Sequence, residues 1–253
     1  MNFIDTHAHL NYKPLLKNHE QVIEQAKESN VIKIICVGTD IPKSYTAIKL
    51  AEKYDMVYAT IGFHPHDIEA AKPGWQQELE KLLTHNKVVA LGEIGLDNYR
   101  SYSPRPLQLQ FFEEQIEIAK SKQLPMILHN READEDTLKI LCKANYTKAV
   151  LHCFGSDAQF AEKAHSLGLY ISFTGNITYN NKKTEKALQA IPMERLMLET
   201  DCPFLSPVPK RGKTNTPSNI SYIAEKVAEL KKIPIHEVAA TTTENAIRFF
   251  NLK

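Results

Sequence analysis

The feature that most constrains the fold of this chain is a regular alternation of short, β-rich apolar runs with longer amphipathic segments. This alternation is typical of a parallel sheet with crossover helices, and not of separate helical and sheet domains. Eight apolar runs qualify as strands: residues 3–7, 33–37, 57–62, 88–94, 125–129, 149–153, 170–174 and 196–201.

The segments between these runs have the spacing of helices. Residues 104–122 begin near a proline and place Leu107, Phe111 and Ile116 at near-helical intervals. Similar segments cover residues 43–54, 74–85, 133–144, 157–167 and 218–230, and a last helix over about 235–250 is expected outside the sheet or across its bottom. Eight strand–helix units in 253 residues predict a single-domain (β/α)8 TIM barrel over residues 1–253, with an open doubly wound sheet as the main competitor.

Charge and cysteine content exclude several classes of protein. Lys and Arg number 31 against 30 Asp and Glu, so no overall field attracts the chain to nucleic acid or to a membrane surface. No apolar run approaches the ~20 residues of a membrane helix, and the four cysteines are scattered without a C-x-x-C pair. We therefore expect a soluble cytoplasmic protein with reduced thiols, and any polyanion must be bound by a local basic patch.

Histidines are concentrated where the predicted strands end. Six of the ten occupy such positions: His7, His9, His64, His66, His129 and His152. The carboxyl ends of parallel strands meet at one rim of a barrel, so these side chains are expected to converge there. His7 and His9 are two residues apart on one strand and therefore share a face, which allows both to reach one ion. Alone, such a pair is equally often ordinary core or surface histidine.

Two carboxylates strengthen the prediction of a metal site. Glu93 and Asp201 each end an apolar run, where an unpaired charge is costly to bury. An ion pair with Arg100 or Arg131 is the plain alternative for Glu93, and a helix cap is the alternative for Asp201. With His129 and His152 ending strands of their own, four histidines and two carboxylates suit two divalent ions bridged by Glu93. Imidazole and carboxylate ligands are compatible with Mg, Mn or Zn.

In this arrangement the sequence resembles the TatD family of metal-dependent deoxyribonucleases, within the amidohydrolase-like barrels. The resemblance spans nearly the whole chain and is carried by the segments DTHAHL (5–10), GFHPH (62–66), GEIGLD (92–97), HCF (152–154), TDCP (200–203) and RGKTNTP (211–217). It implies that His7, His9 and Asp201 hold one ion, that His129 and His152 hold the second, and that Glu93 lies between them. Asn98, Asn130 and the order Gly155-Ser156 depart from the family pattern without removing a ligand.

The predicted activity is hydrolysis of phosphodiester bonds in DNA, as a 3′–5′ exonuclease-type deoxyribonuclease in which two ions activate a shared water. Asp201 and Glu93 are the expected catalytic carboxylates, and Glu199 either orients or assists Asp201, or forms an outer salt bridge. His64, Arg211, Lys213 and Asn215 are the expected substrate contacts. So small a basic cluster favours single strands or accessible ends over long duplex, and a monomer is favoured.

Two other functions stay open at this point. The first is a small-molecule amidohydrolase or esterase on the same barrel, which Glu93 disfavours because related barrels often bridge their metals with a modified lysine. The second is a metal-binding partner protein without turnover. A purely structural metal site is normally closed by its protein ligands, and the basic loop around Arg211 argues against that reading.

Overall fold

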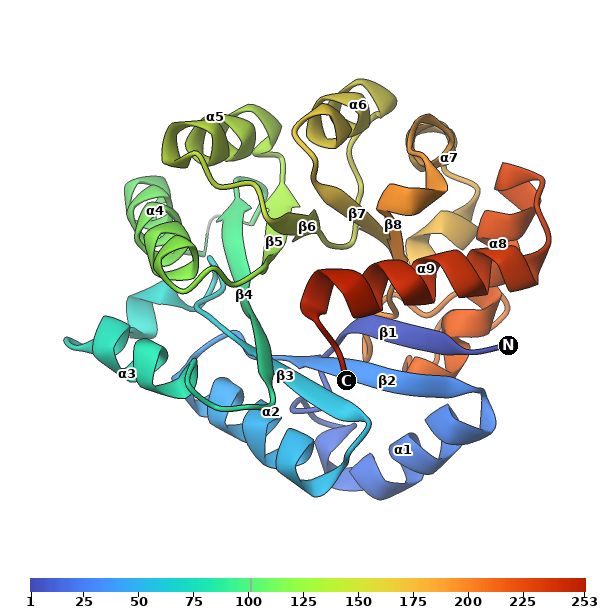
Figure 1. The fold of residues 1–253 in the computed structure, drawn as a ribbon, viewed down its shortest axis with the longest axis horizontal. Coiled ribbons are helices and arrows are strands. Elements are labelled where there is room, and N and C mark those ends of the chain that lie inside the picture. Colours follow the sequence, from blue (N-terminus) through green and yellow to red (C-terminus); the bar gives the residue numbers. More distant parts are fainter. Residues whose placement is uncertain (101) are drawn as a thin grey trace.

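The computed structural model describes residues 1–100 and 102–253. Over these residues it forms one sheet of eight parallel strands in the order β1 to β8, surrounded by nine α-helices (Figure 1). The strands are β1 (Phe3–Ala8), β2 (Val31–Val37), β3 (Val57–Ile61), β4 (Val88–Asp97), β5 (Met126–Arg131), β6 (Ala149–Leu151), β7 (Tyr170–Phe173) and β8 (Leu196–Leu198). The helices are α1 (His19–Glu28), α2 (Ile41–Lys53), α3 (Trp75–Leu82), α4 (Arg105–Ser121), α5 (Asp134–Ala144), α6 (Ala158–Ser166), α7 (Lys182–Ala190), α8 (Ile220–Lys231) and α9 (Ile235–Phe250).

The sheet curls until its first and last strands meet, which confirms the predicted (β/α)8 barrel over an open sheet. A parallel bridge joins Ala8 to Cys202, and the N–H of Asp201 donates to the carbonyl of His7 at 2.9 Å. The buried carboxylate of Asp5 fastens the same seam by accepting hydrogen bonds from the backbone and the hydroxyl of Thr200 at 2.9 and 2.5 Å. Burial raises the pKa of Asp5 to about 7.

The barrel interior is apolar below the rim and is covered at the bottom by the last helix. Side chains such as Ile4, Ile35 and Met197 point inward from the strands and pack with Phe249 and Phe250 of α9. Figure 1 shows α9 crossing in front of the strands near the C-terminus. The predicted helix 235–250 therefore closes the bottom, and burial of large apolar side chains there leaves the opposite rim as the place for polar groups.

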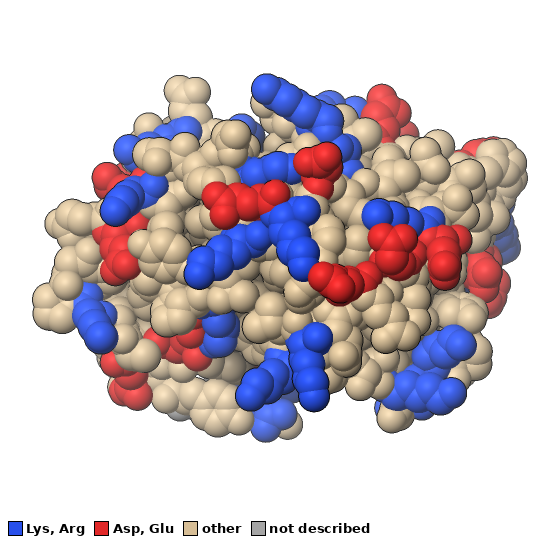
Figure 2. All heavy atoms as spheres, turned by 90° about the horizontal axis from the view of Figure 1, so that it is seen from below, with Lys and Arg blue, Asp and Glu red and all other residues tan. Residues whose placement is uncertain are grey.

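The outer surface carries no long stretch of one charge on the face that includes α1 and α2. Figure 2 shows Lys and Arg interspersed with Asp and Glu across this face. Several of these charges pair, as in Lys53 with Glu20 at 2.7 Å, both on exposed side chains. Within residues 1–100 and 102–253, no helix combines the length and the apolar character needed to cross a membrane.

Candidate metal centre

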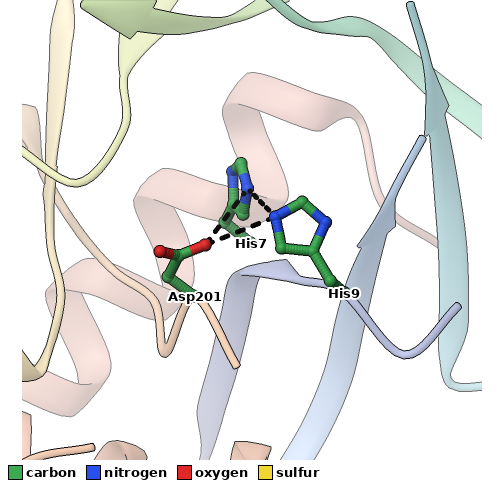
Figure 3. A group of neighbouring side chains, drawn as sticks. All are labelled: His7, His9 and Asp201. Atoms are coloured by element: carbon green, nitrogen blue, oxygen red, sulfur yellow. Dashed lines mark hydrogen bonds and ion pairs between the residues drawn. The ribbon is translucent and has the colours of Figure 1, made fainter. Parts of the chain in front are cut away.

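The first cluster of polar side chains joins the two ends of the barrel. His7 lies in β1, His9 follows that strand, and Asp201 follows β8, so the seam between these strands brings them together (Figure 3). His7 Nε2 and His9 Nε2 lie 3.2 Å apart, and Asp201 Oδ1 lies 3.7 Å from the first and 3.4 Å from the second. All three residues are buried. We call them the Asp201 group.

Glu93, near the end of β4, faces two sets of ligands with its two oxygens. Its Oε2 lies 3.3 Å from His7 Nε2 and 3.7 Å from His9 Nε2. Its Oε1 lies 2.9 Å from His129 Nδ1 and 2.8 Å from His152 Nε2. His129 belongs to β5 and His152 follows β6; we call this pair the His129 group. Glu93 is therefore placed between the two groups, as the sequence predicts.

The cluster favours ionised Glu93 and Asp201 and raises the pKa of the His129 and His152 imidazoles. Burial alone would raise the pKa of Glu93, but His152, His64 and His7 outweigh it and hold that pKa well below its usual range. Asp201 behaves in the same way, with burial opposed chiefly by a hydrogen bond from His9, and its pKa is lowered. Burial also works against a charged His152, yet the carboxylates of Glu93 and Glu199 raise the pKa of His152 well above normal.

Two further carboxylates lie beside the far nitrogens of the His129 group, Asp97 with a hydrogen bond to His129 and Glu199 with a charged contact to His152 that has no hydrogen-bond geometry. Asp97 Oδ2, at the end of β4, lies 3.0 Å from His129 Nε2 and 2.8 Å from His66 Nε2. Glu199 Oε1 lies 3.4 Å from His152 Nδ1 and accepts a 2.5 Å hydrogen bond from the N–H of Cys153. Carboxylates in this position fix the orientation of a ligating imidazole and increase its basicity. The expected partner of Glu199 was Asp201; the structure instead places Glu199 beside His152.

The Asp201 group has no such support. Within residues 1–100 and 102–253, Nδ1 of His7 and Nδ1 of His9 are buried without a hydrogen-bond partner. Burial lowers the pKa of His7, and repulsion from His152 lowers it further. The two imidazoles are therefore oriented mainly by their backbone and by packing.

His64, which follows β3, contacts the centre as a hydrogen-bond donor. Its Nδ1 accepts a 3.0 Å hydrogen bond from the N–H of His66, so the neutral ring carries its proton on Nε2. That Nε2 lies 3.2 Å from Glu93 Oε1. Burial lowers the pKa of His64 to about 4, which keeps the ring neutral near pH 7. In this tautomer Nε2 is a donor, although His64, Glu93 and His129 also present ligand atoms within 4.8 Å of one another.

Glycines in β4 allow the strand to approach β5 closely enough to assemble these contacts. A Cβ on Gly95, whose φ is 138°, would lie 2.0 Å from the carbonyl oxygen of His129. A Cβ on Gly92, whose φ is 158°, would lie 2.7 Å from the carbonyl oxygen of Ile127. The glycines on either side of Glu93 are therefore required by close backbone packing beside the ligands.

The long loop over residues 202–217 follows β8 and differs in part from its prediction. Arg211 and Lys213 are exposed, and the Arg211 guanidinium lies 4.2 Å from the centre of the Tyr179 ring. Asn215, which was expected to contact substrate, is fully buried. Its amide donates to the carbonyls of Thr200 and Phe204 at 2.9 and 2.7 Å, because these backbone groups would otherwise be buried without partners. Asn215 holds the loop against β8.

Asp97 and His66 are residues of the centre that the sequence reasoning did not assign. Asp97 lies beyond the predicted end of its strand at Ile94, although it belongs to the same GEIGLD segment as Glu93. His66, which was expected only to converge on this rim, contacts Asp97 through its ring. The signal that could have identified Asp97 is a second buried carboxylate four residues after Glu93.

The donor set fits divalent cations. Two sets of three side chains present ligand atoms that lie within 4.8 Å of one another. One set is the whole Asp201 group, and the other is His7, Glu93 and His152. His7 Nε2 and His9 Nε2 face each other and the oxygens of Glu93 and Asp201, an arrangement that needs protons or cations between the atoms. Imidazole and carboxylate without thiolate suit Zn, Mn or Mg. Fold and site thus define a (β/α)8 barrel with a histidine–carboxylate metal centre at the carboxyl ends of its strands.

Comparisons with known proteins identify the family. The family model described as TatD related DNase matches residues 4–251. The chain is 43% identical to the uncharacterized metal-dependent hydrolase YabD of Bacillus subtilis, covering 98% of both chains. It is 36% identical to YcfH of Escherichia coli, also named an uncharacterized metal-dependent hydrolase, covering 100% of this chain and 97% of that one. The crystal structure of YJJV, a TatD homolog from E. coli, superposes with a TM-score of 0.93 at 32% identity, covering 99% and 98% of the two chains.

The chain therefore belongs to the TatD family and is a metal-dependent hydrolase.

Proposed function

We propose that this protein hydrolyses phosphodiester bonds of DNA, in the manner of a 3′–5′ exonuclease, with two divalent ions bound by the Asp201 group, Glu93 and the His129 group. The observation that carries the proposal is the position of Glu93, whose two oxygens face the two groups separately. When bound, such a pair of ions lowers the pKa of a shared water and polarises the phosphoryl oxygens. The description of the matched family, TatD related DNase, supports the substrate class.

Side chains of the centre have distinct roles in this proposal. Asp201 is a ligand and accepts the proton of the attacking water, because its lowered pKa keeps it ionised near neutral pH. Glu199 is a positioning residue that acts through His152. His64 presents an N–H at the edge of the Glu93 carboxylate and can donate it to a phosphoryl oxygen or to the leaving oxygen.

Contacts to the DNA backbone come from the loop over residues 202–217. Arg211 and Lys213 supply exposed positive charge on this loop, which begins directly beside Asp201. The chain has a formal net charge of only +1, so we expect weak binding to duplex and action on single strands or accessible ends. A binding role without turnover is disfavoured because the exposed Arg211 and Lys213 lie on the loop that begins beside Asp201.

The decisive experiment compares His129→Ala with the unaltered protein on end-labelled single-stranded DNA, in Mg, Mn and Zn. We expect hydrolysis to fall by at least about 10³-fold, which corresponds to ~4 kcal/mol of lost transition-state stabilisation, while circular dichroism shows a folded barrel. His236→Ala, on α9 far along the chain, is the matched control. Full activity in His129→Ala would reject the two-ion site, and cleavage of small esters or amides without DNA would favour a small-molecule hydrolase.

A further inference from the structure

Two exposed aromatic side chains lie beside the metal centre, and the proposed mechanism does not use them. Phe204, two residues after Cys202, is 49% exposed, and Tyr102, in the segment between β4 and α4, is 61% exposed. Large rings usually gain more by burial than by remaining in water, and exposed rings near a polar site indicate a surface that a ligand covers.

Phe204 is hydrogen-bonded to the Asp201 group through its backbone. Its N–H donates to the carbonyl of Asp201 at 2.9 Å, and its ring centre lies 6.1 Å from that of His9. Tyr12 supports the ring from another side, with centres 6.2 Å apart. A further backbone contact fixes the loop, because a Cβ on Gly175 would lie 2.0 Å from the carbonyl oxygen of Leu205. The backbone around Phe204 is therefore held in place by these contacts while the Phe204 ring stays exposed.

Tyr102 lies at the other end of the centre. Its ring centre is 4.7 Å from that of His66, and His66 contacts His64 with centres 4.4 Å apart. A continuous row of ring contacts connects the two exposed residues, each pair with centres 4.0 to 6.1 Å apart. The row runs Phe204, His9, His7, His152, His129, His64, His66, Tyr102. Phe204 and Tyr102 are therefore the first and last rings of a row that contains the four imidazoles proposed to hold the ions.

We propose that Phe204 and Tyr102 each stack one of the two bases that flank the cleaved phosphodiester, one ring on each side. The proposal rests on the proposed function and adds the identity of the groups recognised beside the phosphate. Every base has a π-face, so stacking on such rings tolerates any sequence. Bases held at opposite ends of the row are separated from each other, and only an unpaired strand can open in this way.

Each of the two rings has an arginine associated with its own segment of the chain. Arg131, at the end of β5, lies over the Tyr99 ring at 4.0 Å, in the same segment as Tyr102. Arg211 belongs to the loop that carries Phe204, and its guanidinium lies over the ring of Tyr179. A guanidinium held against an aromatic ring keeps its N–H groups available for phosphate. Base and backbone contacts would then occur together at both ends of the centre.

The test uses short single-stranded oligonucleotides that lack the base on the 5′ side, on the 3′ side, or on neither side of the cleaved bond. Phe204→Ala and Tyr102→Ala are each expected to lower kcat/KM about 5- to 100-fold on the complete strand. That loss should vanish when the substrate lacks the base on the side served by the altered ring. Tyr102→Phe should retain the wild-type value, and Tyr45→Ala, an exposed ring on the outer helix α2, is the matched control.

A binding measurement separates this inference from the proposed function. 2-Aminopurine placed at either flanking position should lose fluorescence when it stacks on the intact ring, and this quenching should disappear only in the corresponding variant. Equal losses on complete and base-free strands, or quenching unchanged by both substitutions, would overturn the inference. If the unaltered protein quenches 2-aminopurine but cleaves none of the strands, the proposed hydrolysis fails while the stacking is supported.

Discussion

The two halves of the metal centre share Glu93 but are built differently. In the His129 group, Asp97 forms a 3.0 Å hydrogen bond with the far nitrogen of His129, and Glu199 lies 3.4 Å from that of His152 as a charged contact without a hydrogen bond. In the Asp201 group, over the described residues 1–100 and 102–253, Nδ1 of His7 and Nδ1 of His9 have no hydrogen-bond partner. Because outer carboxylates orient ligands before the ion arrives, we expect the His129 group to bind its ion more tightly. The ligands of the Asp201 group are then less firmly oriented, and this group binds its ion more weakly.

Removing the shared carboxylate should produce the largest effect, because it belongs to both halves. Glu93→Gln leaves one oxygen and removes the negative charge that faces five histidines. We expect both ions to be lost and hydrolysis to fall by about 10³-fold or more. Isothermal titration with Mn or Zn and a phosphodiesterase assay measure the two effects. Glu20→Gln, which changes an exposed carboxylate, is the control. If Glu93→Gln still bound two ions, Glu93 would not be the carboxylate that the two ions share.

Titration of the metal-free protein should resolve the two halves. We expect two binding steps of unequal affinity, separated by roughly 10- to 100-fold, the range attributed to outer-shell partners. His9→Ala should eliminate the weaker step and His129→Ala the stronger one. The reverse assignment would show that the Asp201 group forms the tighter site and that outer carboxylates do not set the order of affinity.

Asp97→Asn tests the support itself, without touching a ligand of the Asp201 group. The amide keeps the size of the side chain but weakens the hold on His129 and His66. The stronger binding constant should fall by about 10- to 100-fold while the weaker one is unchanged. Equal losses at both steps would indicate a general distortion of β4, which the crystal structure of the variant would reveal.

The smallest effect is expected from the glycine that allows β4 and β5 to approach. Gly95→Ala places a methyl group against the carbonyl oxygen of His129, and the strands must separate. We expect about 1–3 kcal/mol lower free energy of unfolding, measured with urea, together with weaker binding at the His129 group. Gly168→Ala is the matched control, since Gly168 also has positive φ, at 81°, but no atom within 4 Å of the added Cβ. A control equally impaired in metal binding would contradict the packing argument.

Most of the barrel could be predicted from apolar runs, because buried parallel strands have a simple pattern. The predicted runs for β6 and β8 extend too far, since the chain leaves the ladder at His152 and Glu199 to direct side chains into the centre. The helices α1 and α7 were not assigned, because their apolar faces are narrow: the buried residues of α1 are Val22, Ile23 and Ala26.

The ligand positions could be predicted because polar residues at strand ends share one rim. The outer contacts could not. Asn215 and Asp97 have similar polarity in the sequence, yet one satisfies backbone carbonyls of a buried loop and the other holds a ligating ring. Which partner a buried polar side chain meets depends on residues far along the chain, such as the 32 positions between Asp97 and His129. Spacing alone does not encode this.

The seam between β1 and β8 has a consequence for the order in which the protein forms. His7 and His9 are made about 190 residues before Asp201, which corresponds to roughly 10–40 s of synthesis at ~5–20 residues per second. The Asp201 group therefore cannot capture an ion until the last strand has docked. Metal binding by the Asp201 group therefore depends on barrel closure. The rate of metal binding after dilution from denaturant should equal the rate of this last folding step.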